Sequence, residues 1–207
     1  KFPQAPMMMG VGNVTELTDA DTTGINAVLM GIISELHITH VLTTVVSPHA
    51  AGAVREADVA RRIMYAARES NSLPQHIHDG LLTLRARKPF PDTATEIAEL
   101  ARNIKDPSFR VQVSDDGVHV FNRDGHHVDG DPYELFAHLK LEHDAPHAFY
   151  MGVELARAQI AWQLGKRYYQ DQELEWGCAV QRKPQDLARY ADPGVTLKNP
   201  RNRNSGQ

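Results

Sequence analysis

The chain has 207 residues, of which 42% are hydrophobic and 23% charged, as is ordinary for one mid-sized or two small globular domains. Its net charge of −4 and pI near 6.3 provide no overall basic field for nucleic acid. The single cysteine, Cys178, excludes an intrachain disulfide. The longest apolar run, near residues 28–33, is too short to cross a bilayer. We therefore expect a cytoplasmic protein that binds neither nucleic acid nor membrane.

The first region, residues 1–80, alternates apolar strand-like and helical patterns. Met7–Val11 and His40–Val46 are short, apolar runs that predict buried strands. Thr15–Asp21 is polar and predicts a loop. Apolar residues recur at helical spacing in two further ranges: Thr22–Leu36 and Arg55–Ser70. The order of strand, loop and helix, repeated twice, favours a parallel sheet.

Two strand–helix units cannot close a barrel. A sheet of two parallel strands leaves both edges unpaired and one face poorly covered, although parallel sheets normally bury both faces. The chain also begins at Lys1, without a methionine, which favours a fragment or a processed product. We expect the remaining strands to come first from sequence outside this chain. Another chain and the region after residue 107 are the alternatives.

Three further regions follow. Residues 81–107 form a connector with a short helix, because Thr93 and Glu96 have capping-box spacing. Residues 108–180 predict a small α+β domain, with a three-stranded meander over 110–128, a helix start at Asp131-Pro132 and a long helix over 146–169. The inward face of that helix is expected to carry Phe149, Val153, Ala156, Ile160, Leu164 and Tyr168. Residues 181–207 predict a mobile basic tail, either solvated or touching a partner.

Polar side chains follow the carboxyl ends of both predicted strands of the first region. Asn13, Thr15, Glu16 and Asp19 follow the first strand, and a second set follows the other: Thr44 and His49. Active sites of parallel α/β barrels lie at such strand ends. His49 could serve as a general acid or base there. The alternative is that these residues cap turns and helices, and that His49 is a surface residue.

The stretch PMMMGVGNVTELTD, residues 6–19, resembles a late strand of the pterin-binding (β/α)8 (TIM) barrel. That fold is shared by dihydropteroate synthases and pterin-dependent corrinoid methyltransferases. The strings GVGNVTELTDADTTGINAVLMGI, HVLTTVVSPHA and DGVHVFNRDGHHVDGDPYELF resemble dihydropteroate-synthase-related proteins of tetrahydromethanopterin metabolism, over residues 6–180. The resemblance implies an α/β chain containing the last two strand–helix units of the barrel, followed by a small α+β domain.

The resemblance also implies a function in folate or tetrahydromethanopterin one-carbon metabolism, with a reduced pterin as substrate or ligand. The family's strand-end asparagine, which contacts the pterin ring, corresponds to Asn13. The full-length protein would then be a pterin-dependent transferase of synthase or methyltransferase type. Two departures disfavour the synthase reaction: no lysine lies in Gly10–Asp21, and His40–Val46 does not lead into an Arg-x-His pattern. The expected substrate-binding residues are Asn13, Thr15, Glu16, Asp19, Thr44 and His49.

Two other functions remain open. The chain could be a non-catalytic assembly or regulatory module, in a homodimer or with a partner subunit. It could also be a histidine-based metal hydrolase, because it has eleven histidines. We expect no metal, since the sequence has no HExxH motif and no cysteine pair. His126 and His127 should also point to opposite faces of a strand.

Overall fold

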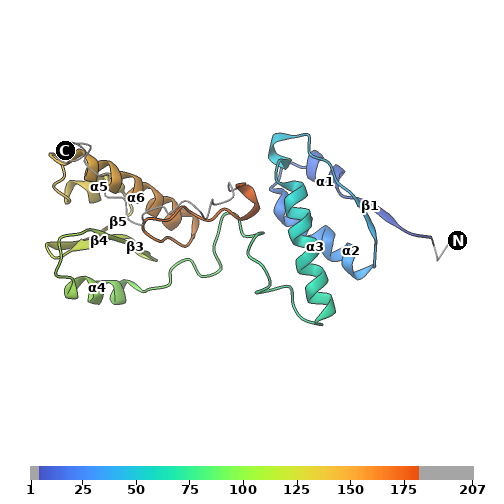
Figure 1. Ribbon diagram of the computed structural model, residues 1–207, viewed down its shortest axis with the longest axis horizontal. Helices are drawn as coiled ribbons and strands as arrows, with labels where there is room; N and C mark the ends of the chain where they lie inside the picture. Colours follow the sequence, from blue (N-terminus) through green and yellow to red (C-terminus); the bar gives the residue numbers. More distant parts are fainter. Residues whose placement is uncertain (1–4, 182–207) are drawn as a thin grey trace, which may run out of the picture. The chain divides into compact units, whose positions relative to one another are not determined.

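A computed structural model describes residues 5–181 and confirms a mixed α/β protein. The described residues divide into two compact units (Figure 1): unit 1 holds residues 5–83 and 176–181, and unit 2 holds residues 84–175. The tail predicted over 181–207 lies outside the described residues after residue 181. In the described part of the chain, no helix is long and apolar enough to span a membrane.

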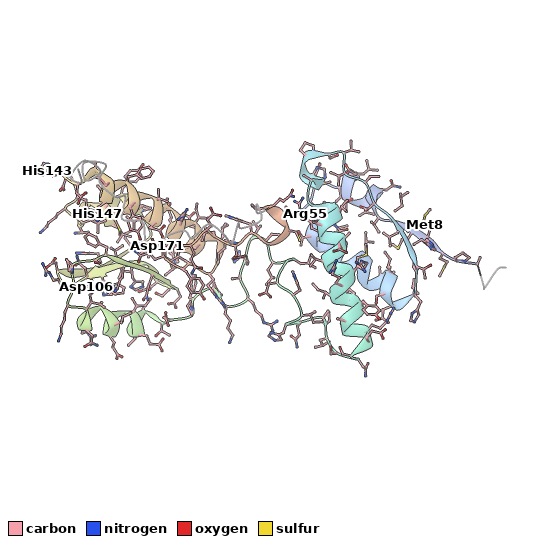
Figure 2. The ribbon with its side chains drawn as sticks, viewed as in Figure 1. Met8, Arg55, Asp106, His143, His147 and Asp171 are labelled. Carbon is pink, nitrogen blue, oxygen red and sulfur yellow. The ribbon has the colours of Figure 1, made fainter. Side chains whose placement is uncertain are left out.

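The sheet of unit 1 has two strands, β1 (Met8–Gly10) and β2 (His40–Leu42), which pair in parallel with Met9 opposite Val41. The parallel pairing is as predicted. Both strands are shorter than expected, and the expectation that they are buried is wrong. Met8 (Figure 2) is 68% exposed and Leu42 is 54% exposed. Within unit 1, helices pack on one face of this sheet, and the face that carries Met8 and Leu42 is exposed.

Two long helices, α2 (Thr22–Glu35) and α3 (Ala53–Glu69), confirm the helices predicted in unit 1 and lie side by side (Figure 1). Together with β1 they enclose a small core: Val11, Met30, Ile33, Ala57 and Ala60. The loop predicted over Thr15–Asp21 is wrong in its first part, because α1 (Gly12–Leu17) forms there. The buried Thr15 hydroxyl donates to the Gly12 carbonyl at 3.0 Å, so this polar side chain is satisfied inside the helix.

Residues 176–181 return to unit 1, although the sequence assigned residues 176–180 to the α+β region. The 3-10 helix η2 (Gly177–Ala179) is held by the Cys178 amide, which donates to the Gly80 carbonyl at 2.8 Å. Arg55 (Figure 2) donates to the Cys178 carbonyl at 3.2 Å. Gly177 has a φ of 52°, and a Cβ there would lie 2.4 Å from the Gly80 oxygen. Only glycine fits so close a backbone approach.

Unit 2 contains the predicted three-stranded antiparallel meander followed by two helices. The helix predicted in a separate connector also belongs to this unit and packs on the sheet. Figure 1 shows α4 on one face of the sheet and α5 with α6 on the other, in agreement with the contacts between these elements. The central strand is buried along its whole length because both faces are covered. The bounds are α4 Ala94–Asn103, β3 Arg110–Ser114, β4 Gly117–Asn122, β5 Gly125–Asp129, α5 Pro132–Ala137 and α6 Ala145–Leu164.

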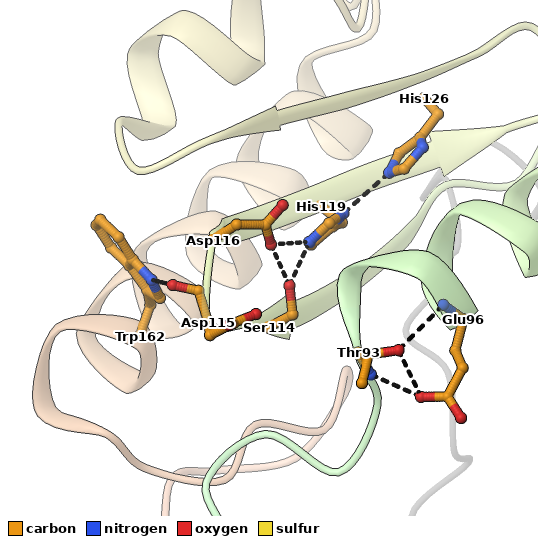
Figure 3. Close-up of polar contacts among 8 residues, drawn as sticks. All are labelled: Thr93, Glu96, Ser114, Asp115, Asp116, His119, His126 and Trp162. Carbon is orange, nitrogen blue, oxygen red and sulfur yellow. Dashed lines mark hydrogen bonds and ion pairs between the residues drawn. The ribbon is translucent and has the colours of Figure 1, made fainter.

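The predicted helix starts of unit 2 are confirmed in atomic detail. Thr93 and Glu96 form a reciprocal capping box at α4 (Figure 3), and Asp131 accepts from the Tyr133 amide at the start of α5. The predicted inward face of α6 is wrong, because Phe149 is 69% exposed. The buried face carries a different set: Met151, Glu154, Leu155, Ala158 and Ala161. α6 also ends at Leu164, earlier than predicted, with Gly165 in the left-handed conformation typical of a helix C-terminus.

Candidate functional site

The segments that follow β1 and β2 meet at the carboxyl edge of the parallel sheet. The ladder continues one step beyond the strands, since the Val11 amide donates to the Leu42 carbonyl at 2.8 Å. A Cβ on Gly12 would lie 2.6 Å from Oγ1 and 3.0 Å from the backbone nitrogen of Thr44. The absence of a side chain at Gly12 therefore lets the two strand ends approach, which places Thr44 next to the start of α1.

Glu16 connects α1 to the segment that follows β2. Its carboxylate accepts the backbone amides of Val46 at 2.8 Å and Ser47 at 2.7 Å. Hydrogen bonds from Ser47, and then from Val46, hold the pKa of Glu16 below its ordinary value, and the nearby imidazole of His49 lowers it further. The carboxylate is therefore ionised at neutral pH and fixes the position of the second strand-end loop.

His49 lies in the short 3-10 helix η1 (Pro48–Ala50), and its Nε2 is 3.1 Å from the Thr15 carbonyl oxygen. Because a carbonyl can only accept, Nε2 must carry the hydrogen, and in a neutral ring Nδ1 is then an acceptor. The backbone of Thr15 thus fixes the tautomer of His49. The Thr15 side chain itself is fully buried, so its hydroxyl serves the turn of α1.

Asn13 lies in the first turn of α1, and its side chain is exposed. Asp19 is exposed too, but it follows the end of α1 by two residues. Of the residues expected from the sequence, the structure links Glu16 and the Thr15 carbonyl to the segment after β2 that carries His49. Thr44 lies beside Gly12, the residue that precedes Asn13 in α1. The carboxyl edge of the sheet offers an amide, an ionised carboxylate, a hydroxyl and an imidazole, a set that can both donate to and accept from a polar heterocycle.

A buried polar cluster at the amino ends of α2 and α3 was missed from the sequence. Glu56 is 4% exposed and accepts from the Thr22 hydroxyl at 2.5 Å and from the Asn26 amide at 3.1 Å. Asn26 is fully buried and also donates to the Ala53 carbonyl at 3.2 Å. The sequence did contain a signal for this cluster. Asn26 is four residues before the core residue Met30 in α2 and therefore lies on the same, buried face of the helix. The cluster ties the two helices together where they leave the sheet edge.

A second polar network lies in unit 2 around the buried His119 (Figure 3). Its Nε2 is 2.6 Å from the Ser114 hydroxyl and 2.9 Å from the Asp116 carboxylate, and its Nδ1 is 3.0 Å from Nε2 of His126. The Ser114 hydroxyl also contacts Asp116. Burial, followed by the charge of His119, lowers the pKa of His126, which favours a neutral His126 ring at neutral pH.

This serine, histidine and aspartate set does not have the geometry of a hydrolytic triad. In a triad, the carboxylate and the serine lie on opposite nitrogens of the imidazole, whereas Ser114 and Asp116 both contact Nε2 of His119. Ser114 is also fully buried. His126 and His127 do contact opposite faces, as predicted: one ring stacks on His119 and the other on His138. Over residues 5–181, no group of three or more His, Cys, Asp or Glu is placed to hold a metal ion.

An uncharacterized protein of Methanocaldococcus jannaschii is 32% identical to the chain over 195 residues. The aligned part is 84% of this chain but only 37% of that protein, so the chain spans little more than a third of its relative's length. No protein-family profile matches the chain. No solved structure matches it either.

Proposed function

We propose that this chain is the carboxy-terminal part of a pterin-binding, dihydropteroate-synthase-related protein of folate or tetrahydromethanopterin one-carbon metabolism. The observation that carries the proposal is the exposed Asn13, in the first turn of the helix that follows a parallel strand. It directly follows Gly12, which closely approaches Thr44 of the loop after the neighbouring strand. Ligands of parallel α/β folds bind at the carboxyl ends of strands. An amide there can pair with the donor–acceptor edge of a pterin.

Unit 1 is, in this proposal, the last two strand–helix units of a (β/α)8 barrel. Two exposed apolar surfaces support it. One is the sheet face that carries Met8 and Leu42, which would point into the barrel. The other is an outer stripe of α2, where Val28, Ile32 and Leu36 are exposed and would pack against the preceding helix. The much greater length of the relative is consistent with earlier strand–helix units outside this chain.

Each side chain at the edge has a distinct part in the proposed site. Asn13 donates to and accepts from the pterin ring. The ionised Glu16 retains lone pairs beyond the two amides it accepts and can accept from a ring N–H group. His49 presents Nδ1 as an acceptor and could serve as a general acid or base. Thr44 and Asp19 supply further polar contacts at the rim, and Thr15 orients His49 through its carbonyl group.

The reaction class that fits best is group transfer to or from a reduced pterin. Condensation of a pterin with an arylamine, as in dihydropteroate synthases, is less suited because the described edge carries no lysine between Gly10 and Asp21 and no Arg-x-His pattern after β2. The remaining pterin contacts would come from earlier strands of the longer protein. Its activity would therefore be a property of the whole protein and not of this chain by itself.

The test is titration of the full-length protein with dihydropterin and with tetrahydropterin. Saturable binding of at least one is expected, and Asn13→Ala should weaken it about tenfold, since one hydrogen bond to a buried ring contributes about 1–1.5 kcal/mol. Asn103→Ala, which removes an exposed amide from α4, is the matched control and should change nothing. The proposal fails if neither pterin binds, or if both variants bind like the wild type.

A second candidate, a non-catalytic assembly module, has one observation in its favour. The apolar residues predicted to form the inward face of α6 are in part exposed to solvent. Phe149 is 69% exposed and Ile160 is 39% exposed. Exposed apolar residues of this kind suit contact with a second subunit. Sedimentation of the full-length protein tests it. The Phe149→Ser and Ile160→Ser double variant should dissociate an oligomer that Gln163→Ser leaves intact, and a monomeric wild type would exclude this candidate.

A further inference from the structure

A cavity of about 300 Å³ lies in unit 1 at the amino end of β2. It is bounded by the last turns of α2, the segment that leads into β2 and the second half of α3. The candidate pterin site lies at the opposite, carboxyl end of the same strand. The cavity is therefore a separate feature, which the proposed function does not use.

The floor of the cavity is apolar. Met30 and Ile33 are core residues, 3% and 7% exposed, and Ile38 packs against them. Val41, on the helix-facing side of β2, completes the floor. Ligand pockets of proteins start at about this volume, and they combine an apolar lining with a few placed polar groups. The floor would thus accept a hydrocarbon or aromatic body.

The wall of the cavity is cationic, and one of its cations is held in place. Arg68 donates from Nη1 to the Ser34 carbonyl at 2.7 Å, its guanidinium lies 5.4 Å from the centre of the Tyr65 ring, and Nη2 is 3.2 Å from Glu69. A guanidinium fixed by several contacts loses little freedom on binding an oxyanion. Arg68 is therefore preorganised as an anion-binding group.

A second cation, Arg61, lines the same cavity. Its partner Asp58 is shared, because this carboxylate contacts Arg61 at 2.5 Å and Arg62 at 2.9 Å. Because Asp58 is shared with Arg62, it balances the charge of Arg61 only in part. None of the residues that line the cavity is acidic. An oxyanion could therefore be attracted by Arg61 and Arg68, the two arginines of the lining.

His37 adds a donor at an unusual backbone position. It follows the end of α2 with a φ of 53°, where glycine is favoured because other residues are strained. Its Nδ1 lies 3.3 Å from Nη1 of Arg68, and since a guanidinium can only donate, Nδ1 accepts and Nε2 carries the hydrogen in the neutral ring. His37 thus presents an N–H donor beside Arg68 in the lining of the cavity.

From the apolar floor, the paired guanidinium groups and this donor, we propose that the cavity binds a small organic acid. Its apolar body would lie on Met30 and Ile33, and its carboxylate or phosphate group would lie between Arg61 and Arg68. Planar guanidinium groups bind both kinds of oxyanion in bidentate fashion. The ligand class is therefore an oxyanion on an apolar body, and the source of the oxyanion is decided by experiment.

The test follows methyl resonances of the purified chain by NMR during titration with four probes. Benzoate and phenyl phosphate carry both an apolar body and an oxyanion, inorganic phosphate lacks the body, and benzyl alcohol lacks the charge. At least one of the two acids should bind saturably and shift the methyl signals of Met30, Ile33 and Ile38. Inorganic phosphate and benzyl alcohol should bind at least tenfold more weakly. Whichever acid binds more tightly identifies the oxyanion.

Two matched variants on α3 test whether binding of the acid needs the positive charge of Arg61. Arg61→Met should weaken binding of the acid at least tenfold. Arg62→Met removes the other partner of Asp58 but no residue of the cavity, and it should weaken binding far less than Arg61→Met. The proposal is overturned if neither acid binds saturably, if the shifted methyl groups lie elsewhere, if benzyl alcohol binds as tightly as the acids, or if both variants have the same effect.

Discussion

The carboxylate of Glu16 accepts the backbone amide of Ser47 at 2.7 Å, which joins the helix that follows β1 to the loop that follows β2. The two residues are 31 positions apart in the sequence. Through this bond, a side chain chosen from the sequence as a ligand contact also determines where the second strand-end loop lies. The shape of the candidate site therefore depends on the ionisation of one exposed carboxylate.

Replacing Glu16 by glutamine should loosen this loop. An amide oxygen is a weaker acceptor than a carboxylate, and the second oxygen is lost as an acceptor. The amides of Val46 and Ser47 should then exchange with solvent faster than in the wild type, as measured by hydrogen exchange. Glu35→Gln, at the exposed end of α2, is the control. Equal protection in wild type and Glu16→Gln would contradict this role.

Acid should have the same effect on the wild-type loop. The pKa of Glu16 is lowered from its ordinary value of 4.5 in the folded chain, so its contribution to stability is present above pH 4.5 and is lost as the pH falls through the folded pKa. Protection of Val46 and Ser47 should decrease over that acid range in the wild type and stay flat in Glu16→Gln. A parallel decrease in both proteins would assign the effect to another group.

A methyl group at Gly12 should disrupt the sheet edge. Its Cβ would lie 3.0 Å from the Thr44 backbone nitrogen, which cannot rotate away, and overpacking of this kind costs about 1–3 kcal/mol. Gly12→Ala should lower the free energy of unfolding, measured by urea denaturation, by that amount, and the midpoint should fall with it. Gly10→Ala is the matched control, because a Cβ there meets no atom within 4 Å. Equal midpoints for the two variants would refute the close approach.

In unit 2, Tyr168→Phe should be destabilising. The Tyr168 hydroxyl donates to the buried Glu154 carboxylate at 2.6 Å, and its pKa is raised by burial and by that carboxylate, so it stays protonated. Loss of a hydrogen bond to a buried charge costs about 1.5–3 kcal/mol. Tyr169→Phe, at the exposed neighbouring residue, should have no effect on chemical unfolding. If the two variants unfold alike, this bond adds no stability.

The histidines of β5 should make unit 2 sensitive to mild acid. Burial lowers the pKa of both His126 and His127 below the ordinary value of 6.5. The unfolded chain then takes up protons that the folded chain does not, so stability is full above pH 6.5 and declines as the pH falls below it. The His126→Gln and His127→Gln double variant should show a shallower decline in thermal unfolding midpoint between pH 7 and 5. The exposed His143→Gln variant should behave as the wild type does.

The parts of the fold that could be predicted are those with local signals. Thr93 with Glu96, and Asp131 with Pro132, mark helix starts by side chains that satisfy the adjacent backbone, so their sequence spacing is informative. The antiparallel meander follows from turn residues between alternating apolar strands. The parallel pairing of β1 with β2 follows from the alternation of strands and helices.

The predictions that were wrong or missing concern features that depend on packing between residues far apart in the sequence. α1 was missed because Gly12 and Asn13 are typical of turns, while the burial of Thr15 depends on the adjoining loop. The prediction of the inward face of α6 was wrong because apolar residues such as Phe149 and Leu155 occur on more than one side of this helix. Only contact with the sheet determines which side is buried. The bond between Glu16 and Ser47 has no local signature, since its acceptor and donor come from different strand ends.

The most direct test of the central claim is a crystal structure of the full-length protein with bound tetrahydropterin. The account predicts that the pterin ring lies at the carboxyl ends of β1 and β2, within hydrogen-bonding distance of the Asn13 amide. It also predicts that a further parallel strand pairs with the free edge of β1. A ring bound away from Asn13, or an antiparallel strand beside β1, would contradict it.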